Sequence, residues 1–284
     1  MVSSSNWNFE LELELTTVHC SLATVHFLLF TFCYSMSFIR GALRFAIALP
    51  AIALAALVII PVSWLPLRVQ RISLAAWLCT LVARLAMRVF NVRFRCDAPD
   101  KLRQHHGLVF PNHISFFDIL MMLHVVPMRF LSAIETRRML FIGQVAAAIG
   151  TVFVDRSNKT SRAEARAQLA RVSRFPPIVL YPEGGTGPAR ALQPFRFGAF
   201  EIAIEHQIPY LPCAIVYSHP AVIEWGHGES FLQALWRLAC FAGPIEARLA
   251  PLEVVQPRPT DDPQQLAVAA HRAIAAVLNV SPQM

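Results

Sequence analysis

Residues 108–118 read LVFPNHISFFD, and this stretch carries the strand-to-helix transition on which the fold prediction rests. The apolar residues at its start predict a short buried strand, which the proline ends. Ser115 is typical of a helix N-cap, and Asp118, three residues later, is its predicted capping-box partner. The stretch therefore predicts a strand, a loop that carries His113, and a helix with Asp118 in its first turn.

The same alternation of short apolar runs and helical patterns continues on both sides of this stretch. Strands are expected at Val92–Cys96, Leu108–Phe110, Arg129–Ile134, Thr151–Val154, Ile178–Tyr181, Tyr210–Val216 and Ile245–Leu249. Helices are expected at 116–125, 137–148, 160–173, 196–206 and 263–278. Alternating strands and helices predict an α/β domain over residues 90–284, with a mixed sheet flanked by helices. In such domains, sites form just past the carboxyl ends of the strands.

The N-terminal third has a different character. Residues 15–39 and 45–67 contain no Asp, Glu, Lys or Arg, and roughly 20 apolar residues suffice for a helix to span a bilayer. Pro50 and Pro61 are expected to kink or end the second helix. We therefore expect residues 1–89 to form a membrane anchor with interfacial helices.

Two further features of this region bear on its topology. Residues 74–89 predict a helix that lies either in the membrane interface or on the globular domain. The arginines that follow the apolar run place the globular part, and with it the active site, on the cytoplasmic side. The first 35 residues lack Arg, Gly and Pro, so Met36 is an alternative start of the protein.

Composition agrees with a membrane protein. The chain is 55% hydrophobic and 15% charged, whereas soluble domains have roughly 45–50% and about 25%. The formal net charge of +7 favours an anionic membrane surface or an anionic substrate. With no Lys/Arg run or zinc-ligand spacing, nucleic acid is not an expected partner. None of the six cysteines forms a Cys-x-x-Cys pair, so free thiols are expected.

His113 and Asp118 are the candidate catalytic pair. A carboxylate in the first turn of a helix can reach back to an imidazole in the preceding loop, fix its tautomer and stabilise the imidazolium. The other ring nitrogen can then take a proton from a hydroxyl. Without a serine or cysteine in a nucleophile elbow, the acceptor hydroxyl itself would attack an acyl thioester. The alternative is that Asp118 only caps the helix and His113 is a loop histidine.

Candidate anion-binding residues follow two other strands. Arg156 comes directly after a strand, and a guanidinium is well suited to a phosphate. The glycine-rich turn 183–187 has backbone N–H groups that can bind an anion, while Glu183 is expected to orient an arginine or the turn. A surface ion pair and a plain tight turn are the alternatives. The candidate substrate-binding residues are Arg156, Glu183, Gly184, Gly185, Thr186, Arg190 and Arg196.

Taken together, these segments resemble the glycerolipid acyltransferase family, which includes lysophosphatidic acid acyltransferases. The family's blocks are Asn-His-x4-Asp, Phe-Val/Ile-Asp-Arg, Phe/Tyr-Pro-Glu-Gly, Leu-x-Pro-Phe-Lys/Arg-x-Gly-Ala and a proline-rich strand. They correspond here to residues 112–118, 153–156, 181–184, 192–199 and 208–214. Order and spacing agree over about residues 90–220.

The resemblance implies a mechanism. His113 would be the general base and Asp118 its partner. The donor would be acyl-CoA or acyl-carrier protein, and the acceptor a lysophospholipid, in the first place 1-acyl-sn-glycerol-3-phosphate. The acceptor phosphate would lie near Arg156 and the Glu183 turn. The resemblance implies neither a metal nor a bound cofactor.

One departure keeps other functions open. Many members have Glu-Gly-Thr-Arg in the third block, where the arginine is thought to hold phosphate, but here Gly185 and Thr186 follow Gly184. Arg190 or Arg196 could compensate. Otherwise the acceptor could be lysophosphatidylcholine, lysophosphatidylethanolamine or a lyso-ornithine lipid. A lipid-binding protein with a lapsed active site and a thioesterase are the alternatives from other classes.

Overall fold

The computed structural model describes residues 5–188, 191–226 and 228–279, with side chains from residue 35 onward. Within these residues, a seven-stranded sheet lies at the centre, in the order β3-β9-β8-β4-β7-β5-β6. The strands are β3 (Val92–Cys96), β4 (Leu108–Pro111), β5 (Arg129–Ala133), β6 (Val152–Val154), β7 (Ile178–Val179), β8 (Tyr210–Tyr217) and β9 (Ile245–Pro251). Neighbouring strands are parallel except β8 and β9, which are antiparallel. The sheet is therefore mixed, and each predicted strand is found.

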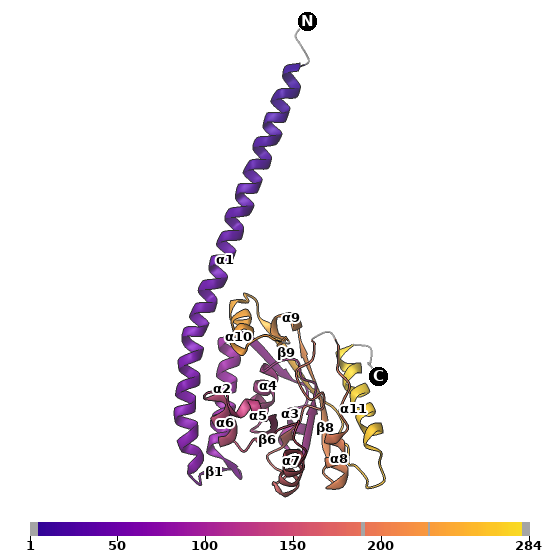
Figure 1. Ribbon diagram of the computed structural model, residues 1–284. Helices are drawn as coiled ribbons and strands as arrows, with labels where there is room; N and C mark the ends of the chain where they lie inside the picture. Colours follow the sequence, from indigo (N-terminus) through magenta and orange to yellow (C-terminus); the bar gives the residue numbers. More distant parts are fainter. Residues whose placement is uncertain (1–4, 189–190, 227, 280–284) are drawn as a thin grey trace.

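Helices cover both faces of this sheet (Figure 1). On one face lie α2 (Leu74–Val89) and α4 (Phe117–Val125), and on the other lie α7 (Lys159–Arg171), α8 (Gly198–Glu205) and α11 (Pro263–Leu278). Strand β4 shows how the residues divide between the faces. Val109 lies in the first core, while Leu108 and Phe110 lie in the second. Successive side chains of a strand point to opposite faces, so a wholly apolar strand such as β4 is buried on both.

The predicted helix 137–148 is wrong in its extent. The structure has two short helices there, α5 (Ile134–Arg137) and α6 (Ile142–Ala148). They are separated at Phe141, whose φ of 63° lies in the left-handed region. A residue in that conformation cannot continue a right-handed helix. Apolar periodicity predicted the helical residues but not this break.

Three further helices were not predicted, namely α3 (Pro99–Arg103), α9 (Pro220–Ile223) and α10 (Phe231–Cys240). The sequence does carry a signal for α10. Ser230 and Gln233 form a capping box. The serine hydroxyl accepts from the backbone N–H of Gln233 at 3.3 Å, and the Gln233 side-chain oxygen accepts from the backbone N–H of Ser230 at 2.9 Å. This pairing marks a helix N-terminus.

The N-terminal segments form a single helix, α1 (Ser5–Trp64), where two segments were predicted. Pro50 and Pro61 lie inside it and do not end it. A proline removes its own N–H donor from the ladder and its ring clashes with the carbonyl of the preceding turn, but α1 is held from the side by α2, α6 and α10. Within the residues whose side chains are described, Ser35–Trp64 is long and apolar enough to cross a membrane. Most of the predicted segment 15–39 precedes residue 35, so it lies outside the residues whose side chains are described.

A two-stranded hairpin connects α1 to the helix that follows. Strands β1 (Arg68–Val69) and β2 (Ile72–Ser73) are antiparallel. Helix α2 then begins with Ser73 as its N-cap and has the predicted bounds. Buried residues of α1 and α2 belong to the same hydrophobic core as strands of the sheet. The division of the chain into residues 1–89 and 90–284 stays a prediction.

Helix α1 is fastened to the end of α10. Arg44 donates hydrogen bonds to the carbonyl oxygens of Ala239, at 3.0 Å, and of Phe241, at 2.9 Å. Carbonyls at a helix C-terminus lack partners within the helix, so cationic donors stabilise them. The Trp236 ring meets aromatic rings of α1 edge-on. At Gly41 the two helices approach so closely that a Cβ atom would lie 2.6 Å from the Cys240 Sγ.

Gly41→Leu is therefore expected to destabilise the protein by roughly 1–3 kcal/mol, because overpacking forces neighbouring side chains and backbone to shift. Thermal unfolding in detergent, followed by circular dichroism, measures this effect. Ala51→Leu is the matched control, since Ala51 lies on the exposed side of the same helix. Equal melting temperatures for the two variants would contradict the close approach of α1 to α10.

Candidate active site

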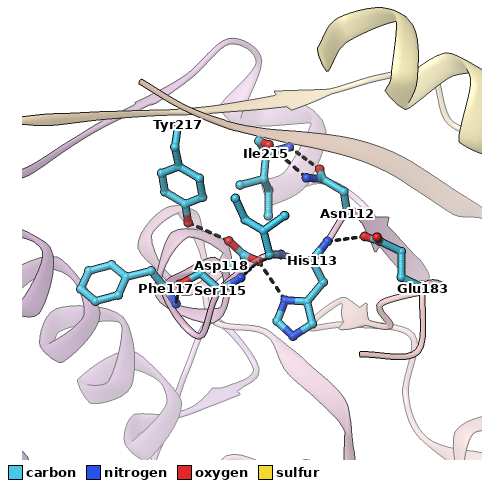
Figure 2. Close-up of polar contacts among 9 residues, drawn as sticks. Asn112, His113, Ser115, Phe117, Asp118, Glu183, Ile215 and Tyr217 are labelled. Atoms are coloured by element: carbon cyan, nitrogen blue, oxygen red, sulfur yellow. Dashed lines mark hydrogen bonds and ion pairs between the residues drawn. The ribbon is translucent and has the colours of Figure 1, made fainter. Parts of the chain in front are cut away.

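The loop after β4 is fixed to the neighbouring strand by Asn112 (Figure 2). Its amide nitrogen donates to the Ile215 carbonyl oxygen at 3.1 Å, and its amide oxygen accepts from the Ile215 N–H at 2.7 Å. Both groups of the buried side chain are thus satisfied by the backbone of β8. The amide replaces a stretch of strand pairing and holds the start of the loop in place.

His113 and Asp118 meet as predicted. The His113 Nδ1 lies 2.8 Å from the Asp118 Oδ2, and the carboxylate is fully buried. The same oxygen accepts from the backbone N–H groups of Ile114, at 2.7 Å, and Ser115, at 2.9 Å. These donors favour the ionised carboxylate. An ionised Asp118 is a hydrogen-bond acceptor only, so it requires the proton on the Nδ1 side of the imidazole.

The predicted helix cap is wrong in one respect. Helix α4 begins at Phe117 with Phe116 in the N-cap position, and the Ser115 hydroxyl accepts from the Phe117 N–H at 3.2 Å. Asp118 does reach back to the Ser115 N–H, which is half of a capping box. The carboxylate therefore organises the loop and orients the imidazole at the same time, so the structural and catalytic interpretations of Asp118 are compatible.

One face of the His113 ring is covered by another aromatic ring, and the side chain stays partly accessible to solvent. The Tyr181 ring stacks on it with 3.8 Å between centroids and 18° between planes. The His113 side chain is 14% exposed, and Figure 2 shows its Nε2 pointing away from Asp118. With the proton on Nδ1, Nε2 carries the lone pair that a general base needs.

Glu183 ties the glycine-rich turn to the His113 loop. Its Oε1 accepts from the His113 N–H at 2.6 Å, and its Oε2 accepts from the Gln193 N–H at 3.0 Å. Burial raises the pKa of the Glu183 carboxyl to about 7, although these two N–H donors act in the opposite direction. The expectation that Glu183 orients the turn agrees with these contacts, which are to backbone amides and not to an arginine.

Two arginines converge on Gly184. The Arg156 guanidinium donates to the Gly184 carbonyl oxygen, and a Cβ atom at Gly184 would lie 2.7 Å from the Arg196 Nε. Burial and then the charge of Arg196 lower the pKa of Arg156. Two guanidinium groups held together in this way favour an anion beside them. The alternative, an ion pair between Asp155 and its neighbour Arg156, is not formed, since the Asp155 carboxylate accepts from Ser157 instead.

The other predicted substrate-binding residues are placed as follows. Gly185 is exposed, and a Cβ atom there would meet nothing within 4 Å. Thr186 is half-buried in the same turn. Arg190 lies outside the described residues. Among the residues that are described, no group of three or more His, Cys, Asp or Glu side chains is arranged to hold a metal ion, and Cys79, Cys96, Cys213 and Cys240 are free thiols.

Comparison with known proteins identifies the family to which this arrangement belongs. The family model described as Acyltransferase matches residues 93–216, which include all the segments above. Residues 93–216 therefore carry a domain of this acyltransferase family. The fold is that of the 1-acyl-sn-glycerophosphate (LPA) acyltransferase PlsC from Thermotoga maritima. That crystal structure superposes with a TM-score of 0.68 over 87% of this chain and 96% of the other, at 17% identity.

The curated relatives of this chain differ in their named substrates. The 1-acyl-sn-glycerol-3-phosphate acyltransferase beta of Homo sapiens is 29% identical over 53% of this chain and 54% of its own. The lyso-ornithine lipid O-acyltransferase of Pseudomonas aeruginosa is 31% identical over 55% and 57%. The chain thus spans about half the length of these relatives.

Two contacts of the candidate site were missed by sequence reasoning. The Tyr217 hydroxyl donates to the Asp118 Oδ1 at 2.7 Å, and Tyr181 stacks on the imidazole. The alternation of β8 is a signal that could have found Tyr217. Leu211, Cys213, Ile215 and Tyr217 share one face of the strand and one core, and a tyrosine at the end of such a row needs a hydrogen-bond partner.

Proposed function

We propose that this protein is an O-acyltransferase that moves a fatty acyl group from an acyl thioester to the free hydroxyl of a lysophospholipid. The observation that supports this most is the pair of His113 and Asp118, with Nδ1 engaged by the buried carboxylate and Nε2 directed away from it. Such a pair can deprotonate a hydroxyl without a covalent enzyme intermediate.

The reaction follows from this geometry. The acceptor hydroxyl gives its proton to the His113 Nε2 while its oxygen attacks the thioester carbonyl carbon. Asp118 stabilises the imidazolium that forms. When the tetrahedral intermediate collapses, the carbon–sulfur bond breaks and the imidazolium returns the proton to the leaving thiolate. The products are an ester and a free thiol, of either CoA or acyl-carrier protein.

For the acceptor, we propose 1-acyl-sn-glycerol-3-phosphate, which would give phosphatidic acid. Arg156 and Arg196, which both adjoin Gly184, are suited to a phosphomonoester. They would thus take the role of the arginine that many family members have in the third block, where this chain has Thr186. A lyso-ornithine lipid is the second candidate, since a relative of similar identity is named for it.

We further propose that the protein acts at a membrane with its site on the cytoplasmic side. Helix α1 supplies the 30 residues Ser35–Trp64, which are long and apolar enough to cross a membrane. Exposed apolar side chains follow directly after it in the chain, at Leu65, Leu67 and Val69. A protein attached to the bilayer in this way would receive the lysolipid from the bilayer.

Arg156→Ala and Arg196→Ala are each expected to raise the KM for lysophosphatidic acid by about tenfold or more, with a smaller effect on kcat, because charge-assisted hydrogen bonds to phosphate are lost. Initial rates at varied acceptor concentration measure this. Arg93→Ala is the control, since Arg93, on β3, forms an exposed ion pair with Glu246, on β9. An unchanged acceptor KM in both variants would contradict the phosphate site.

A panel of acceptors tests the proposed function itself. Membranes that contain the protein would be given labelled oleoyl-CoA, or oleoyl-acyl-carrier protein, with each of several lysolipids. Label in phosphatidic acid is the expected result. Label only in an ornithine lipid or another phospholipid would keep the reaction and change the acceptor. Label in no diacyl lipid from either donor would overturn the proposal.

A further inference from the structure

Both oxygens of the Asp118 carboxylate are engaged, but by donors of different kinds. Oδ2 accepts from the His113 Nδ1 and from two backbone N–H groups of its own loop. Oδ1 accepts from the Tyr217 hydroxyl, at 2.7 Å, which comes from the last residue of β8 (Figure 2). The side chain of Asp118 is wholly buried. Tyr217 thus donates a hydrogen bond to this carboxylate from outside the loop.

We propose that Tyr217 is a positioning residue of the transfer reaction, which holds the Asp118 carboxylate toward His113 and weakens its pull on the imidazole proton. This inference rests on the proposed function, since it concerns how the base of that reaction is set. A hydroxyl that donates to Oδ1 draws negative charge away from Oδ2. The imidazolium form of His113 is then less stabilised, and the free base persists to lower pH.

The fold fixes Tyr217 in this role. Burial, and then the nearby charge of Asp118, raise the pKa of the Tyr217 hydroxyl well above its usual range, so it stays protonated and donates. Asn112 pairs with the backbone of Ile215, two residues earlier on β8. This pairing joins β8 to the start of the loop that carries His113, and the Tyr217 hydroxyl lies 2.7 Å from the Asp118 Oδ1.

Other titratable groups also face this centre. Tyr181 stacks on His113, and burial raises its pKa well above the usual range. Burial likewise raises the pKa of the Cys213 thiol behind it. Glu183 accepts from the His113 N–H, and burial raises the pKa of its carboxyl to about 7. The pH profile of Tyr217→Phe must therefore also be taken in a Glu183→Gln background.

The test is the pH dependence of kcat/KM for acyl transfer. The acid limb is the fall of kcat/KM on the acid side of its pH profile. Tyr217→Phe is expected to move the midpoint of this limb to higher pH, by about half a pH unit to one unit, and to lower kcat by about tenfold at neutral pH. The shift should persist in the Glu183→Gln background. Tyr210→Phe is the matched control, because Tyr210 is a buried tyrosine at the other end of β8, packed on Phe110 and Phe200. Its acid limb should equal that of the wild type.

A second variant serves if Tyr217→Phe fails to fold. Incorporating 3-fluorotyrosine at position 217 keeps the hydroxyl and makes it a stronger donor, so the acid limb should move downward. An acid limb that moves with neither change would overturn the inference, and so would a shift that disappears with Glu183→Gln. A wild-type protein with no transfer would instead overturn the proposed function, so the two failures are distinguishable.

Discussion

His113→Ala is expected to lower kcat for acyl transfer by about 10²–10⁴-fold, the contribution of a well-placed general base. The KM values should change little, because Nε2 acts in the proton transfer of the transition state and not in substrate binding. Initial rates in membranes with matched protein levels measure this. His106→Ala is the control, since His106 is an exposed histidine that stacks on Phe175. Transfer by His113→Ala at near the wild-type rate would exclude His113 as the base.

Asp118→Ala is expected to lower the free energy of unfolding by about 3 kcal/mol or more, in addition to abolishing most activity. The substitution removes the acceptor of four hydrogen bonds, from the His113 ring, the N–H groups of Ile114 and Ser115, and the Tyr217 hydroxyl. Buried donors without partners are costly. Denaturant unfolding in detergent and initial rates measure the two effects.

Asp118→Asn separates these two roles. It preserves the shape of the side chain and one acceptor oxygen, so the loss of stability should be smaller than with alanine. Activity should still fall by about 10²-fold or more, because a neutral amide cannot stabilise the imidazolium. Asp155→Ala is a control for stability, since the Asp155 carboxylate accepts from groups of Ser157, close by in the chain, and is not buried. An Asp118→Ala protein as stable as Asp155→Ala would contradict the contacts described for the carboxylate.

Much of the fold could be predicted because its signals are local. The central strands β4, β7 and β8 are short apolar runs, and burial on both faces makes such runs stand out. The pair of His113 and Asp118 was also predictable, since the two residues are five positions apart and a loop before a helix brings them together.

The remainder depends on contacts between residues far apart in the chain. Tyr217 and Asp118 are 99 positions apart, and Glu183 and His113 are 70 apart. Local patterns carry no information about such pairs. Helix α1 continues through Pro50 and Pro61, where local propensity predicts an end, because packing against other helices outweighs one lost hydrogen bond. Tertiary contacts therefore decide what propensity alone predicted wrongly.

Glu183 illustrates the same limit within the candidate site. The sequence indicates a carboxylate beside a glycine-rich turn, which is unfavourable for binding a phosphate. In the structure, both carboxylate oxygens accept backbone N–H groups, and Arg156 and Arg196 lie at the neighbouring Gly184. The carboxylate thus joins the loops through their backbone N–H groups, a role that the sequence alone does not reveal.

The most direct test of the central claim is whether release of the donor thiol requires a lysolipid. Purified protein in lipid-containing micelles would be given acyl-labelled oleoyl-CoA, with and without lysophosphatidic acid, and free thiol and labelled products would be measured together. We predict that thiol is released only when the lysolipid is present, with one label in phosphatidic acid for each thiol. Thiol release at the same rate without lysolipid, with the label in free oleate, would contradict the account and identify a thioesterase.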